Sequence, residues 1–134
     1  MRIKHVCQPD DTGCGIACLA MILNLTYNQV KDWMIKNKFL KPGTNDFGTT
    51  FQDLYKVLAE HRIKIVRKRK FKQWRNIPAK VAIVSTNYNA SGCWHWVVFI
   101  RDIEGCFIYD PGKRRKKIRD FRGKVSGQFI EVIL

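Results

Sequence analysis

Hydrophobic positions in the first half of the chain recur at the spacing of helices. The segment over residues 14–25 is apolar on almost every side, as expected of a helix that is buried in the core. Thr26 can cap a second helix, and Thr49 with Gln52 has the spacing of a capping box that opens a third. The predicted helices therefore cover residues 14–25, 26–38 and 49–61.

After residue 61 the pattern changes to that of short strands. Apolar or alternating runs are separated by residues that favour turns. The expected strands are 63–66, 81–84, 94–101, 106–109 and 129–134, with a single turn over 71–74. The third and fourth of these strands pair as a hairpin across residues 102–105, in a register that sets His95 opposite about Gly112.

Helices that precede a run of neighbouring strands predict an α+β domain, in which N-terminal helices pack on a C-terminal antiparallel sheet. The 134 residues, of which 46% are hydrophobic, fit a single domain over residues 1–134. No apolar stretch reaches the length of about 18 residues that a transmembrane helix needs. The N-terminus lacks the apolar middle of a signal peptide, so we expect a cytoplasmic chain or an effector that another system delivers.

The formal net charge of +14 is concentrated in two basic runs. Arginines and lysines recur over residues 62–75 without an acid, and over residues 113–124 with only Asp120 among them. Such runs fit an acidic substrate, nucleic acid or an anionic surface. They fit equally well two solvated borders that keep the protein soluble. The sequence leaves the oligomeric state open.

The five cysteines are an odd number and lack the paired spacing of a structural zinc site. This usage favours a reducing compartment. Cys18 and Cys106 have apolar neighbours and are expected to be buried thiols. The count leaves room for one reactive thiol among the others.

Cys14 is the candidate reactive thiol, because it stands where a helix is expected to begin. The free N–H groups and the dipole of a helix N-terminus favour the negatively charged thiolate, which is the nucleophilic form. Gly13 and Gly15 allow a sharp entry into the helix and the close approach of a substrate backbone. Three interpretations stay open: a core thiol, a metal ligand with Cys18 and His95, or a nucleophile. The metal site is the weakest, since it lacks a clear full set of ligands.

Three further side chains could serve a nucleophilic cysteine. His95 lies in a strand-like apolar run, where an imidazole needs a polar partner, and Asp110 ends the next strand. A carboxylate beside an imidazole fixes its tautomer and favours the imidazolium. Gln8, upstream of the cysteine, can donate its amide to a developing oxyanion. The order of cysteine, histidine and acid along the chain is that of a papain-type site.

Three strings of residues carry a resemblance to a known family: Gln8 followed by Cys14-Gly15, then His95-Trp-Val-Val-Phe, then Tyr109-Asp110-Pro111. On these strings the chain resembles the papain-like bacteriocin-processing cysteine peptidases, whose domain clips double-glycine leader peptides. The resemblance implies a papain-like fold that needs no metal and no organic cofactor. It also implies four site residues with distinct roles: Cys14 as nucleophile, His95 as base and acid, Asp110 as the orienting acid and Gln8 as the oxyanion donor.

The chain departs from the family's habit at Gly13, where an acid is usual, while Asp10 and Asp11 stand slightly earlier. Members best known for leader cleavage are joined to a membrane transporter. This chain has no transporter segments, so we expect a freestanding member. The predicted function is hydrolysis of a peptide or amide bond by a Cys-His-Asp triad, in leader processing or as a toxin or effector.

A basic nucleic-acid-binding or nuclease toxin domain on the same scaffold is the alternative prediction. Phe71, Trp74 and Phe121 stand among the basic runs, where aromatic rings can stack on bases while lysines and arginines hold phosphates. Against this, the chain has no RNA-binding signature. A peptide or protein substrate is therefore the first expectation.

Overall fold

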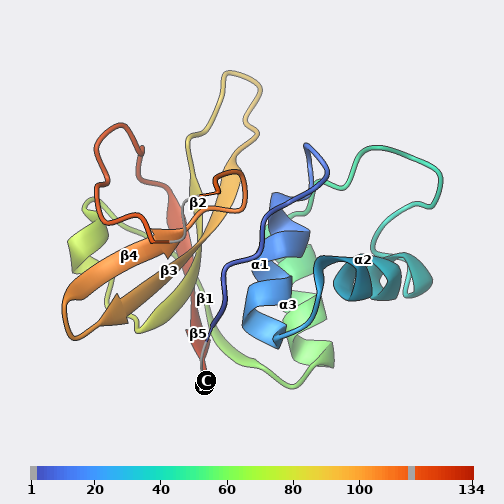
Figure 1. Ribbon diagram of the computed structural model, residues 1–134, viewed down its shortest axis with the longest axis horizontal. Helices are drawn as coiled ribbons and strands as arrows, with labels where there is room; N and C mark the ends of the chain where they lie inside the picture. The colour runs from blue at the N-terminus through green and yellow to red at the C-terminus, as the bar shows by residue number, and fades with distance from the viewer. Residues whose placement is uncertain (1–2, 115–116) are drawn as a thin grey trace.

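Helices and sheet form two layers in the computed structural model of the chain, which describes residues 3–114 and 117–134. The helices are α1 (Cys14–Leu23), α2 (Tyr27–Lys36) and α3 (Phe51–Glu60), with a short 3₁₀ helix η1 (Trp74–Asn76). The strands are β1 (Lys64–Lys70), β2 (Val81–Thr86), β3 (His95–Asp102), β4 (Gly105–Tyr109) and β5 (Gln128–Ile133). The three α-helices lie on one side of the sheet (Figure 1), which confirms the predicted α+β class. Within the described ranges, no helix is long and apolar enough to span a bilayer.

The first helix is the central helix of the core, as its apolar sequence predicts. All residues of α1 from Cys14 to Ile22 are buried. The helix ends where Asn24 adopts a left-handed conformation, with φ of 56°. At its other end Gly13 provides no side-chain cap, so the first N–H groups of α1 receive no bond from that residue.

The other two helices begin with capping boxes. Thr26 and Gln29 cap α2 reciprocally, which confirms the predicted start of that helix. The predicted start of α3 at Thr49 is wrong by one residue, because Thr50 and Asp53 form its capping box. Thr49 is instead held by the sheet, since its carbonyl oxygen accepts a hydrogen bond from the indole N–H of Trp96 at 3.3 Å.

The sheet has five strands in the order β1-β5-β2-β3-β4, and every pair of neighbours is antiparallel. In the β3–β4 hairpin, Val98 lies opposite Tyr109 and Arg101 lies opposite Cys106. This is the register that the sequence predicts. The start of β3 and the end of β4 therefore lie side by side at the open end of the hairpin.

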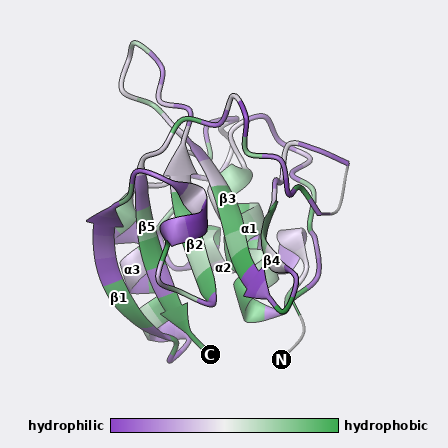
Figure 2. Cartoon of the chain, turned by 90° about the vertical axis from the view of Figure 1, so that its left-hand side faces the viewer, coloured by the Kyte–Doolittle hydropathy of each residue, from purple (hydrophilic) through white to green (hydrophobic). Residues whose placement is uncertain are grey.

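Strand β1 is longer and more polar than predicted, since it continues from the expected 63–66 segment through the basic residues to Lys70. It is an edge strand with mostly exposed side chains and stands out as hydrophilic beside the apolar central strands (Figure 2). Arg67 lies 4.9 Å from the ring centre of Tyr55, and Lys68 lies 4.6 Å from that of Phe51. Such long side chains cover aromatic surface while keeping their charge in water. The strand therefore lacks the apolar periodicity by which strands are predicted from sequence.

The turn predicted over residues 71–74 is displaced, because the structure forms the 3₁₀ helix η1 at Trp74–Asn76 instead. Trp74 is buried there and stacks on Phe121, with ring centres 5.1 Å apart. This packing covers the face of the sheet opposite the α-helices. Trp74 and Phe121 are two of the three aromatic residues on which the alternative nucleic-acid prediction depends, and here they stack on each other.

Of the two cysteines that were predicted to be buried, Cys18 is buried and Cys106 is only partly buried. Cys18 is fully buried in the layer between α1 and the sheet, whereas Cys106 is half-buried on the opposite face. All five cysteines are free thiols.

Gly15 lets the loop before α3 approach the start of α1. A Cβ atom at this position would lie 2.0 Å from the hydroxyl oxygen of Thr49 and 3.2 Å from Cδ1 of Trp96. We therefore expect Gly15→Ala to lower the free energy of unfolding by about 1–3 kcal/mol, because overpacked cores must shift to make room. Urea denaturation measures this loss.

Two variants control for the loss of a glycine in general. Adding Thr49→Ala to Gly15→Ala removes the clashing hydroxyl and should restore part of the stability. Gly48→Ala places its Cβ no closer than 3.3 Å to Asp46 Oδ1, so we expect a smaller effect there. Equal stability of Gly15→Ala and the native chain would contradict the close packing.

Candidate active site

Cys14 is the first residue of α1 and faces the sheet at the edge where β3 begins. Its side chain is nearly buried, with 9% of the residue exposed. The peptide N–H groups of the first helical turn lie at the same place, because α1 begins at this residue. A developing negative charge at the thiol would therefore meet the positive end of the helix.

His95 and Asp110 meet across the β3–β4 hairpin, as the predicted register requires. The Nε2–H group of His95 donates to Asp110 Oδ1 at 2.6 Å. Asp110 is 4% exposed, and the same oxygen accepts a second bond from the backbone N–H of Gly112 at 2.8 Å. Burial acts to raise the pKa of Asp110, but the bonds from His95 and Gly112 outweigh it and hold the pKa below its usual range.

His95 lies between Asp110 and Cys14. Burial acts to lower the pKa of His95, but the hydrogen bond with Asp110 and the nearby Cys14 side chain outweigh it and raise the pKa to about 9. The imidazole is therefore mostly protonated at neutral pH. Because Asp110 takes Nε2, the nitrogen left to exchange a proton with another group is Nδ1.

Gln8 is placed beside this pair by the backbone. Its N–H donates to the carbonyl of Pro111 at 2.9 Å, which ties the N-terminal segment to the end of β4. The side-chain amide donates to the carbonyls of Asp10 and Asp11, at 3.0 and 2.9 Å. Its oxygen Oε1 is buried and has no hydrogen-bond partner among the described residues. The structure thus brings Gln8 to the site, with its N–H groups directed at the loop.

Asp10 anchors the loop that carries Gln8, and no motif in the sequence marks its partners. Its carboxylate accepts a hydrogen bond from Tyr27 Oη at 2.7 Å and pairs with Lys31 Nζ at 3.1 Å. The hydrogen bond from Tyr27 is the largest cause that holds the pKa of Asp10 below its usual value. A Cβ at Gly13 would lie 2.0 Å from Tyr27 Oη, so the tyrosine fills the space beside that glycine.

His5 is a second residue that sequence analysis missed. Its Nε2–H donates to the backbone carbonyl of Asp110 at 2.8 Å, and its ring lies 5.4 Å from that of Tyr109. The bond fixes the main chain of the residue whose side chain holds His95. No motif marks His5, since its role follows only from where the N-terminal segment runs.

Aromatic side chains form one side of the site. The rings of Trp94 and Trp96 meet edge to face at 5.5 Å, and Phe51 contacts both, at 5.4 and 4.8 Å. The indole N–H of Trp94 is buried and has no partner within the described part of the chain. These rings fix the backbone just before and just after His95.

The metal-site interpretation of Cys14, Cys18 and His95 has no further ligand to draw on. Residues 3–114 and 117–134 contain no group of three or more histidine, cysteine or acidic side chains that could hold an ion. The four predicted site residues lie together where the start of α1 meets the open end of the β3–β4 hairpin. They are Gln8, Cys14, His95 and Asp110.

The chain matches the model of a known protein family. The model of a family described as the peptidase C39 family matches residues 2–134, which is almost the whole chain. The match confirms the resemblance drawn from the strings around Gln8, Cys14, His95 and Asp110. No curated protein gives a significant match.

Proposed function

Because the chain belongs to the peptidase C39 family and is therefore a cysteine peptidase, we propose that Cys14 is its nucleophile and His95 its general base and acid. Asp110 orients the imidazole. The observation that carries this proposal is the position of His95, which bonds with Asp110 through Nε2 and lies near enough to Cys14 for that side chain to raise the pKa of the imidazole. A protonated imidazole beside a thiol stabilises the thiolate.

The reaction follows from these positions. The Cys14 thiolate attacks the carbonyl carbon of a peptide bond, and the carbonyl oxygen becomes an oxyanion near the start of α1. His95 gives the Nδ1 proton to the leaving amine, which departs and leaves an acyl-enzyme. The neutral imidazole then takes a proton from water, whose hydroxide attacks the thioester and releases the acid. The thiolate and imidazolium are restored, and no cofactor takes part.

Two groups are available to stabilise the oxyanion. The backbone N–H of Cys14 is one of the free donors of the first helical turn. Gln8 is the other, although its amide N–H groups point at loop carbonyls in the free enzyme. Its unpartnered Oε1 and Cε1 of His95 both lie within 4 Å of the place that a Cβ of Gly112 would take, so a half-turn of the amide would bring a donor to that place instead of the acceptor. Gln8 therefore acts by turning when substrate binds.

The substrate is a peptide, and leader-peptide processing is the activity that the family resemblance implies. A toxin or effector role would use the same chemistry on a protein target. Five free thiols suit a reducing compartment such as the cytoplasm.

The alternative nucleic-acid prediction gains no specific support. Several arginines of the basic runs are already paired, since Arg69 bonds with Glu131, Arg119 with Asp102 and Arg122 with an aspartate two residues before it. Arg115 and Lys116 lie outside the described residues.

Alkylation of the native chain tests the role of Cys14. We expect iodoacetamide at neutral pH to modify Cys14 at least about tenfold faster than Cys7 or Cys93, because a thiolate reacts and a thiol does not. The two comparison cysteines are exposed, whereas Cys14 is nearly buried. Accessibility alone would give the opposite order, so peptide mapping by mass spectrometry separates the two causes. Slower reaction at Cys14 than at Cys93 would refute the proposed nucleophile.

A further inference from the structure

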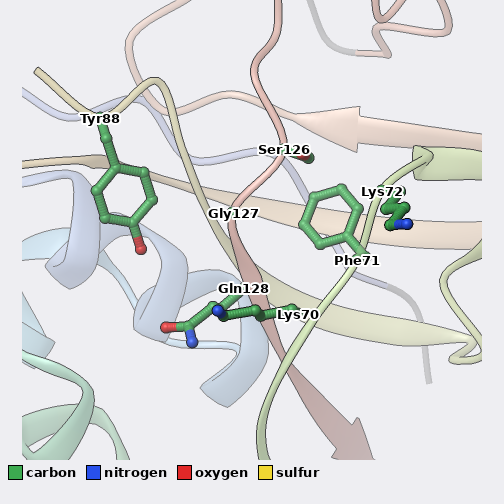
Figure 3. Close-up of a pocket in the computed structure, with 7 residues that line it drawn as sticks. All are labelled: Lys70, Phe71, Lys72, Tyr88, Ser126, Gly127 and Gln128. Atoms are coloured by element: carbon green, nitrogen blue, oxygen red, sulfur yellow. The ribbon is translucent and has the colours of Figure 1, made fainter.

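A groove lies where β1 ends and β5 begins, beside the loop that joins β2 to β3. It has a volume of about 610 Å³ and is lined by Lys70, Phe71, Lys72, Tyr88 and residues 126–128. Figure 3 shows Tyr88 and Phe71 on opposite sides of the chain segment that carries Gly127. None of the four predicted site residues lines it.

The floor of the groove depends on a glycine. A Cβ atom at Gly127 would lie 2.2 Å from the carbonyl oxygen of Ser85 and 2.8 Å from Cε1 of Tyr88. Only the absence of a side chain lets this backbone pack so closely beneath Tyr88. The groove floor is therefore main chain, which can approach the main chain of a ligand.

The two aromatic walls are held from behind. Tyr88 Oη shares a hydrogen bond of 2.7 Å with Ser85 Oγ. The ring of Phe71 contacts those of Trp74 and Phe129, with centres 5.0 and 6.1 Å apart. Because both rings are already fixed, an apolar side chain placed between them would bind without the cost of ordering the walls.

The rim of the groove is positively charged. Lys70 and Lys72 are exposed, and the lining contains no carboxylate. Arg69, next in the chain, is paired with Glu131 at 3.0 Å. Among the described residues, by contrast, neither of the two lysines forms an ion pair. Two ammonium groups beside an apolar slot favour a ligand with acidic groups around an apolar one.

Tyr88 connects the groove to the residue that precedes His95. The ring of Tyr88 lies 5.3 Å from that of Trp94, and Trp94 directly precedes His95. An extended peptide that leaves the groove past Tyr88 therefore meets the tryptophan beside the catalytic imidazole. This continuity favours part of a peptide substrate over a nucleic acid as the occupant.

We propose that this groove binds an acidic segment of the peptide substrate, with an apolar side chain over the main chain of Gly127, flanked by Phe71 and Tyr88, and with carboxylates at Lys70 and Lys72. This inference rests on the proposed function, since it takes the occupant to be part of the substrate. It predicts a preference for acidic substrates that comes from two lysines rather than from the overall charge of the chain.

Binding to the Cys14→Ala chain tests the groove without requiring catalysis. A fluorescent Glu-Leu-Glu peptide should bind at least about tenfold more tightly than its Gln-Leu-Gln counterpart, measured by fluorescence anisotropy. Lys70→Gln with Lys72→Gln should remove this difference. Lys41→Gln with Lys56→Gln, exposed lysines outside the groove, makes the same change in net charge and should leave the difference intact. Equal loss in both pairs of variants would overturn the proposal.

A tethered electrophile tests the connection to the active site in the native chain. A bromoacetyl group joined to either end of Glu-Leu-Glu by about two to eight glycines can span a series of distances. At least one linker should alkylate Cys14 about tenfold faster than free bromoacetamide does, and Lys70→Gln with Lys72→Gln should abolish the gain. No gain at any linker length would overturn the proposal, as would a lysine-dependent gain seen only with a tethered thymidine oligonucleotide. If Cys14 of the native chain does not react with free bromoacetamide, the result counts against the proposed nucleophile. The anisotropy measurement still tests whether the groove binds the acidic peptide.

Discussion

Replacing His95 with alanine is expected to lower the rate of hydrolysis of any peptide that the native chain cleaves by about 10³-fold or more. Two contributions are lost at once. In the proposed mechanism the imidazolium stabilises the Cys14 thiolate and protonates the leaving amine, and the variant can do neither. Steady-state kinetics should show the loss in kcat, because the imidazole acts on the reacting atoms rather than on substrate binding.

His61 provides a matched control for this substitution. Its ring bonds through Nδ1 to the carbonyl of Val57 at 2.9 Å and packs against Trp33, at the end of α3 away from the site. We expect His61→Ala to keep nearly native kcat, even if it lowers the thermal stability. A His95→Ala chain that is folded and hydrolyses peptide within tenfold of the native rate would rule out the proposed base.

The fold could be predicted where local sequence decides the structure. The helices follow from apolar periodicity and the caps, and α2 begins at Thr26 as expected. The start of α3 was misplaced because Thr49 and Thr50 both have a partner three residues on, and only tertiary contact with Trp96 decides between them. The predicted strand 63–66 was shorter than β1, because the charged side chains of β1 lie on aromatic rings of α3 and the sequence does not show that these rings are nearby.

The site could be predicted where residue type and register suffice. A hairpin with the expected register brings His95 to Asp110, and the helix start supplies Cys14. The support from Asp10 with Tyr27 and from His5 could not be predicted, because it depends on how a loop and the N-terminal segment cross other elements. Such contacts leave no periodic trace in a sequence.

The proposed nucleophile and its proposed base come from different layers of the fold. Cys14 belongs to α1, whereas His95 and Asp110 belong to the hairpin. The distance between them is therefore set by packing between α1 and β3, in which Trp96 is 2% exposed. Residues that only fill this layer, such as Gly15 with Thr49, are thus tied to the geometry of the reaction.

The free energy of unfolding is expected to fall by up to about 3 kcal/mol as the pH rises from about 6.5 to above 9, because of His95. The folded chain raises the pKa of this imidazole to about 9, so it holds the proton more tightly than the unfolded chain does. Its stabilising contribution is complete below the unfolded pKa of about 6.5 and is lost as the pH passes through the folded value. Urea denaturation at a series of pH values measures the slope.

Asp110→Asn isolates this contribution from other groups that titrate in the same range. Cys18, whose pKa is raised by burial, also makes stability fall at alkaline pH, but it does so in both chains. Without the carboxylate, the imidazolium loses its main stabilising partner, so the fall attributable to His95 should largely disappear from the variant. The midpoint of the His95 ring-proton shift in NMR spectra should move down from about 9 toward its ordinary value. Parallel stability curves and an unmoved midpoint would mean that Asp110 does not hold the proton on His95, and its orienting role would fail with them.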